Sequence, residues 1–136
     1  MSSSQKLSCL LLVLACVTYT VQQLRDPAFM QKFQGYKEEC SKEIGIDSAI
    51  VDKAWAENHF PNDEKLKCFF KCINMKFGVL TASGDVVDDE LKKVSAQFVD
   101  AATDTEIVTE CGAIQGADLC DTAMKLMACI KSATLD

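Results

Sequence analysis

The sequence has few of the residues from which catalytic and metal sites are built. Its 136 residues include one histidine, His59, with no cysteine thiol or serine elbow beside it. We interpret His59 as a surface-loop residue, with a pH-sensing role as the alternative. One imidazole is too few for a zinc centre when the cysteines are used elsewhere, and no acidic run has the order of a calcium loop. We therefore expect no enzyme activity, no metal and no cofactor.

The chain also lacks basic clusters and has one long apolar run. Twenty acidic residues against 14 basic ones give a net charge of −6, so neither nucleic acid nor anionic lipid is an expected partner. The apolar run, residues 7–17, follows Lys6 and is shorter than the roughly 20 residues of a transmembrane helix. We interpret residues 1–20 as a secretory signal peptide and residues 21–136 as one exported domain, secreted to the extracellular space.

Strand patterns are nearly absent, while helical periodicity and helix caps recur along the chain. The sequence predicts an all-α fold of six short helices. Asn62 is expected to cap the third helix, and Thr103 with Glu106 to form the capping box of the fifth. Ile50 and Ala54 are expected to face inward from the second. The expected helices cover about residues 27–45, 47–57, 62–77, 88–98, 103–112 and 118–130.

Six cysteines remain after the signal peptide, and an even number in a small exported chain indicates a disulfide framework. Cys68 and Cys72 lie one turn apart on the third helix, so they cannot easily bond to each other. Cys120 and Cys129 are nine residues apart on one helix, roughly 13 Å. These exclusions leave about ten of the fifteen pairings open. The third helix must send its two cysteines to different partners. The six are Cys40, Cys68, Cys72, Cys111, Cys120 and Cys129.

The cysteine spacing, with three residues between Cys68 and Cys72 and eight between Cys120 and Cys129, resembles that of the insect odorant-binding proteins. The resemblance covers the whole chain after the signal peptide. It implies six short helices around an apolar cavity, cross-linked by three interlocked disulfides. The implied pairs, which include neither excluded pair, are Cys40–Cys72, Cys68–Cys120 and Cys111–Cys129.

Aromatic and methionine stripes on the expected helices have two interpretations: ordinary core, or the wall of a ligand cavity. Three disulfides at roughly 2–5 kcal/mol each can offset the weaker packing around an open cavity. Together with the resemblance, this predicts a non-enzymatic carrier of small hydrophobic molecules such as odorants, pheromones or fatty-acid-like ligands. We expect it to deliver them to a membrane odorant receptor, as a monomer or weak homodimer. The expected ligand-binding residues are Phe33, Tyr36, Phe69, Ile73, Leu91, Val94, Phe98, Val108, Met124, Met127 and Leu135.

Two alternatives remain open at the level of sequence. The same fold could carry lipids or semiochemicals in reproductive or salivary secretions, outside olfaction. A disulfide-stapled helical protein without a cavity could instead bind partners through an exposed apolar patch. The seven residues after Cys129, residues 130–136, are too few for an extra helix inside a cavity. We expect this tail at most to lie across the cavity mouth, with Leu135 as its apolar contact.

Overall fold

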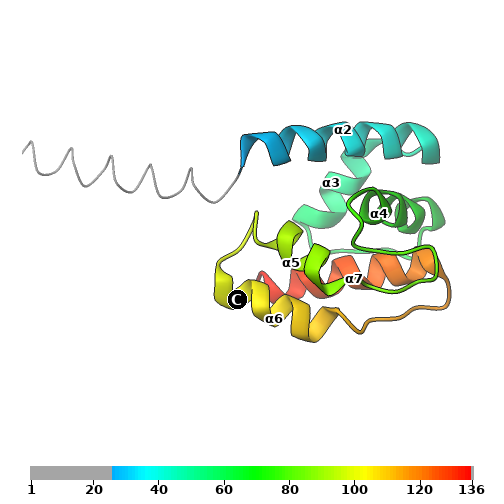
Figure 1. Ribbon diagram of the computed structural model, residues 1–136. Helices are drawn as coiled ribbons and strands as arrows, with labels where there is room; N and C mark the ends of the chain where they lie inside the picture. The colour runs from blue at the N-terminus through cyan, green and yellow to red at the C-terminus, as the bar shows by residue number, and fades with distance from the viewer. Residues whose placement is uncertain (1–25, 136) are drawn as a thin grey trace, which may run out of the picture.

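The computed structural model describes residues 26–135, so the expected signal peptide lies outside the described residues. The described part is all-α, as predicted, and one isolated bridge pairs Leu80 with Val86 in the connection between the third and fourth helices of that part. Within residues 26–135, no helix is long and apolar enough to cross a membrane. The six helices, shown in Figure 1, are α2 (Pro27–Ile44), α3 (Ser48–Ala56), α4 (Glu64–Lys76), α5 (Asp88–Ser95), α6 (Ala101–Cys111) and α7 (Leu119–Ala133).

Aspartate side chains begin five of these six helices, because a carboxylate can accept the otherwise unpaired N–H groups of a first turn. Two N-caps differ from the prediction. Asp63, not Asn62, starts α4 by accepting the N–H of Leu66 at 2.8 Å. Asp100, not Thr103, starts α6, and the N–H of Thr103 donates to it at 2.8 Å. In both places an aspartate near the predicted cap takes its role.

Two further differences concern where helices end. We expected the fourth helix to reach Phe98, but α5 ends at Ser95. The hydroxyl of Ser95 donates to the carbonyl of Leu91 at 2.9 Å and also to the carboxylate of Asp104, and such backbone contacts of serine compete with helix continuation. At the C-terminus, α7 extends past Cys129 to Ala133, which is buried. Most of the expected free tail is therefore the last turn of a helix.

Helix α4 is cross-linked to two other helices. Figure 1 shows α2 above α4 and α7 below it, with α5 to the left of α4 and α6 at the lower left. One disulfide joins α2 to α4, a second joins α4 to α7, and a third joins α6 to α7. The Cα–Cα distances are 5.8, 4.6 and 5.8 Å, all within the range of ordinary disulfides. The pairs are Cys40–Cys72, Cys68–Cys120 and Cys111–Cys129, the set that the resemblance implies.

Buried apolar side chains form two core clusters. The first lies mainly between α2, α3, α4 and α7 and includes Leu66, Phe69 and Phe70. The second, mainly between α5, α6 and α7, includes Leu91 and Ile107. Partly buried Phe77 and Val86 pack against both clusters, so the two are joined rather than separate.

Helix α3 contributes a different face to the first core cluster from the one expected. Its buried residues are Val51 and Ala54. Ile50 is 52% exposed, because at 100° per residue it lies to one side of the direction that Val51 and Ala54 share. The inward position of Ala54 is confirmed, and that of Ile50 is wrong.

Gly35 lies in the middle of α2, and no heavy atom comes within 4 Å of the Cβ that an alanine would add. We expect Gly35→Ala to stabilise the protein by about 0.5–1 kcal/mol, because alanine loses less backbone entropy in a helix. Thermal unfolding by circular dichroism should show a midpoint a few degrees higher. The contrasting variant is Gly45→Ala, because Gly45 has a left-handed φ of 75° at the end of α2. It should lower the midpoint; a lower midpoint for Gly35→Ala would contradict this explanation.

Asp121, in the first turn of α7, gives a pH-dependent contribution to stability. Its carboxylate accepts the backbone N–H of Ala117 at 2.8 Å and lies 3.2 Å from the Lys125 amine, and these contacts lower the pKa of Asp121. A lowered folded-state pKa stabilises the protein above the unfolded pKa of about 3.9, and the effect is lost as pH falls through the folded value. We expect Asp121→Asn to lower the unfolding midpoint at pH 6, and the difference from wild type to shrink below about pH 3.

The matched control is Asp118→Asn, because asparagine caps a helix about as well as aspartate. It should change the midpoint little at either pH. An Asp121→Asn variant with the same deficit at pH 6 and at pH 3 would show that the carboxylate charge is not the cause.

Candidate functional site

Five aromatic rings from three separate segments meet beneath the first half of α2. Phe29, Phe33 and Tyr36 are spaced i, i+4 and i+7, so they share one helix face. Phe77 follows the end of α4, and Phe98 follows α5. Ring centroids of contacting pairs lie 4.9 to 6.4 Å apart. We refer to these five residues as the aromatic cluster.

The aromatic cluster supports the part of α2 that the disulfide does not hold. Cys40 fixes the second half of α2 to α4. At the other end, the backbone N–H of Asp26 donates to the Gln97 side chain at 3.1 Å, beside Phe98. Figure 1 shows the start of α2 at the same end of the molecule as the connection between α5 and α6. The first half of α2 is therefore held by aromatic contacts, by the packing of Phe33 on the first core cluster and by one long-range hydrogen bond, but by no disulfide.

The cluster is open to solvent on one side. Phe98 is 39% exposed, while Phe29, Phe33, Tyr36 and Phe77 are partly buried. Exposure of apolar surface to water is unfavourable, so binding of an apolar molecule that covers the partly exposed rings is favourable. The cluster thus combines an apolar contact surface with access from outside.

Two lysines border the cluster at Tyr36. The amines of Lys32 and Lys76 lie 5.7 and 6.0 Å from the centre of that ring. Lys76 is 3.1 Å from a carboxylate oxygen of Glu39 and 3.3 Å from one of Glu43, and hydrogen bonds to these carboxylates raise the pKa of Lys76. The charge of Lys76 is therefore already compensated, whereas Lys32 is exposed on the helix surface.

The structure divides the expected ligand-binding residues among several places. It brings Phe33, Tyr36 and Phe98 together in the aromatic cluster. It adds Phe29 and Phe77, which are not among the expected ligand-binding residues. The four-residue spacing of Phe29 and Phe33 indicates that these two share a helix face. No local pattern indicates that Phe77 contacts them. Of the others, Phe69, Ile73, Met124 and Met127 belong to or pack against the first core cluster. Leu91, Val94 and Val108 belong to or pack against the second.

Leu135 lies apart from the remaining expected residues. It is 59% exposed and belongs to neither core cluster. Its backbone N–H donates to the Ser132 carbonyl at 3.3 Å, continuing the last turn of α7. The role of this end of the chain as a lid stays a prediction.

Polar groups inside the described part of the chain are few, and apart from the Ser41 hydroxyl the buried ones are hydrogen-bonded. The Asn74 amide donates to the Phe70 carbonyl at 2.8 Å. Asp104, which is 3% exposed, accepts the Ser95 hydroxyl, and the Thr122 hydroxyl accepts the Gly116 N–H at 2.9 Å. Among residues 26–135, the buried ionisable side chain is the carboxylate of Asp104, and no lysine, arginine or histidine there is buried.

Two surface hollows lie away from the aromatic cluster. One, of about 310 Å³, lies over the two disulfides of α4, and the other, of about 240 Å³, lies beside α2 and the start of α3. Charged side chains border both, and neither includes a residue of the aromatic cluster. Their linings are Glu43, Ile44, Cys68, Lys71, Cys72, Met75 and Lys76 for the first, and Gln34, Lys37, Glu38, Ser41, Lys42 and Ser48 for the second.

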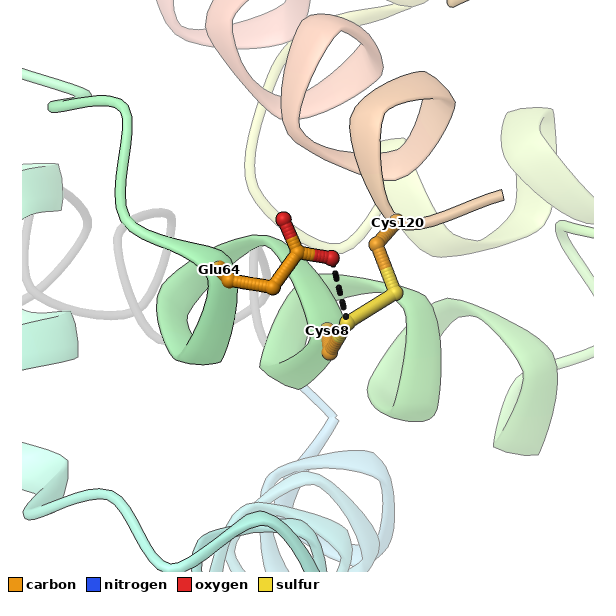
Figure 2. Close-up of side chains that lie close together, drawn as sticks. All are labelled: Glu64, Cys68 and Cys120. Carbon is orange, nitrogen blue, oxygen red and sulfur yellow. Dashed lines mark hydrogen bonds between the residues drawn. A yellow bond between two sulfur atoms is a disulfide. The ribbon is translucent and has the colours of Figure 1, made fainter. Parts of the chain in front are cut away.

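Among residues 26–135, one group of potential metal ligands forms between α4 and the start of α7: Glu64, Cys68 and Cys120. Figure 2 shows the Glu64 carboxylate beside the Cys68–Cys120 disulfide, with its oxygen 3.5 Å from the Cys68 sulfur. A disulfide sulfur carries neither the hydrogen of a donor nor the negative charge of a thiolate ligand. The contact is therefore a close approach of an exposed carboxylate, and the group cannot hold zinc while the bond is closed.

Comparisons with known proteins agree on one family. The model of the PBP/GOBP family matches residues 22–133. The general odorant-binding protein 69a of Drosophila melanogaster is 25% identical over 104 residues, which cover 76% of this chain and 70% of that protein.

Solved structures show the same fold at low identity. Odorant-binding protein dmelOBP28a from Drosophila melanogaster has a TM-score of 0.66 and 23% identity, over 79% of this chain and 93% of that one. A fatty acid binding protein, OBP56a, from the oral disk of the blowfly Phormia regina has a TM-score of 0.64 and 22% identity, over 80% and 94%. The six-helix fold, its three disulfides and the family match lead to one conclusion: the chain belongs to the PBP/GOBP family of odorant-binding proteins.

Proposed function

We propose that the protein is a secreted carrier that takes up small hydrophobic molecules between the first half of α2 and the helices below it. The aromatic cluster is the observation that carries this proposal. Its five rings combine an apolar surface with access from solvent. They lie beneath the half of α2 that no disulfide holds. The family match and the description of the blowfly relative as a fatty acid binding protein support a carrier of this kind.

Burial of apolar surface gives such binding a large favourable free energy without any charged contact. A ligand of about ten carbons that buries roughly 300 Å² of apolar surface gains about 7.5 kcal/mol at 25 cal/mol per Å². A micromolar dissociation constant corresponds to about −8 kcal/mol. Uptake requires the first half of α2 to move away from Phe77 and Phe98, which breaks ring contacts with those two residues but no disulfide, because Cys40 lies in the other half. An aromatic or aliphatic ligand would replace those contacts with its own.

Export and delivery are part of the same proposal. The interpretation of residues 1–20 as a signal peptide and the three disulfides both suit an oxidising extracellular compartment. In that compartment the exported domain, for which we propose residues 21–136, would keep an apolar molecule in solution until it reaches a membrane odorant receptor.

The first test is binding of a fluorescent apolar probe, N-phenyl-1-naphthylamine, to the oxidised protein. We expect a dissociation constant near one micromolar, and loss of binding after the disulfides are reduced. Phe98→Glu should weaken binding at least tenfold, because a carboxylate would replace the exposed ring at the open side of the cluster. The partial exposure of Phe98 makes this variant compatible with folding.

Ile50→Glu is the matched control, because Ile50 is also an exposed apolar residue but lies on α3, outside the cluster. It should leave probe affinity unchanged. Equal affinity of wild type and Phe98→Glu would place the ligand elsewhere. If no probe binds and a second protein binds through the surface at Phe98, the result would instead support the alternative of a helical interaction protein without a cavity.

A further inference from the structure

We propose that the site prefers neutral aromatic molecules to carboxylates and to saturated molecules of the same size. This inference rests on the proposed function and concerns the class of ligand that the same site takes. Two independent observations carry it: the geometry of the rings in the aromatic cluster, and the distribution of charge around them and in the described interior.

The rings of the cluster already use both favourable geometries of aromatic pairs. Phe98 meets Phe29 and Phe33 edge-on, with interplanar angles of 74° and 66°. Phe77 lies nearly parallel to the same two rings, at 27° to each. A flat aromatic ligand entering between Phe98 and Phe77 can therefore meet edges on one side and faces on the other. Such contacts add affinity beyond the area buried, because the ring quadrupoles interact, and a saturated ring lacks them.

The surroundings of the cluster offer little to a carboxylate. Lys76 is paired with Glu39 and Glu43. Lys32, the other lysine at Tyr36, is exposed, and ion pairs in that setting contribute little. An anion near these rings also meets a protein whose net charge is −6.

A carboxylate carried further inside would also lack a partner. In the described part of the chain the buried ionisable group is Asp104, itself an acid, and the buried Asn74, Ser95 and Thr122 side chains are hydrogen-bonded. The buried Ser41 hydroxyl lacks a hydrogen-bond partner among these residues, but it is neutral and lies beside Cys40, outside the aromatic cluster. Removing a carboxylate from water without a compensating cation is strongly unfavourable. The charge distribution therefore favours a neutral ligand, in contrast to the fatty acids named for the blowfly relative.

The test compares three molecules with one carbon skeleton: methyl 2-naphthoate, 2-naphthoate, and methyl decahydro-2-naphthoate. The affinity of each molecule is measured by its displacement of N-phenyl-1-naphthylamine from the wild-type protein at pH 7. We expect the aromatic ester to bind about tenfold more tightly than the aromatic anion and than the saturated ester. An anion or a saturated ester that binds as tightly as the aromatic ester would overturn the preference while leaving the carrier function in place. Failure of the probe and of all three molecules to bind would overturn both.

Variants that remove one aromatic ring test whether the aromatic cluster causes the preference for aromatic ligands. Phe29→Leu and Phe98→Leu keep an apolar side chain but remove the quadrupole, so the ratio between aromatic and saturated esters should fall from about tenfold to about threefold or less. Phe60→Leu is the control, because Phe60 contacts Trp55 and Phe70 outside the aromatic cluster. The ratio should stay near tenfold in that variant. A ratio that falls equally in all three, or in none, would show that the aromatic cluster does not select the ligand.

Discussion

The structure depends on the two disulfides that join α4 to two different helices, α2 and α7. Cys72 bonds to Cys40 on α2, and Cys68, one turn earlier, bonds to Cys120 on α7. Native disulfides in small secreted domains typically contribute about 2–5 kcal/mol each. Because both originate on one helix, they fix α2 and α7 relative to α4 and hold the first core cluster between them.

The disulfide holds only one half of α2, and the candidate site lies beneath the other half. The half of α2 near Cys40 is bound covalently, whereas the half that carries Phe29 and Phe33 lies on aromatic rings from the segments after α4 and after α5. A partly exposed segment opens at lower free-energy cost than the buried core. Our proposal is therefore that an apolar molecule enters under α2 while α4 and α7 stay packed.

The sequence predicted the class of fold and most helices, because aspartate caps and 3.6-residue periodicity are local signals. Two N-caps were wrong because a second capping residue stood near the expected one, Asp63 beside Asn62 and Asp100 before Thr103. Geometry alone left about ten disulfide pairings open, and the family resemblance supplied the observed one. The end of α5 at Ser95 was missed: the Ser95 hydroxyl contacts both the Leu91 carbonyl of its own helix and Asp104 of α6, and no local pattern reveals the second contact.

The candidate site was only partly predictable for a related reason. Periodicity shows which side chains of a helix face inward but not which helix they meet. Phe69 and Phe33 therefore looked equivalent in the sequence, yet Phe69 is 1% exposed in the core and Phe33 belongs to the open aromatic cluster. The meeting of Phe77 and Phe98 with α2 depends on loops between helices.

The central claim is that the ligand binds beneath the first half of α2. Intermolecular nuclear Overhauser effects between methyl 2-naphthoate and the isotope-labelled, oxidised protein test it most directly. We expect contacts from the naphthalene protons to the rings of Phe29, Phe77 and Phe98. Contacts confined to Ile44 and Met75 at the surface hollow over α4, or to Leu126 and Ile107 in the second core cluster, would contradict it.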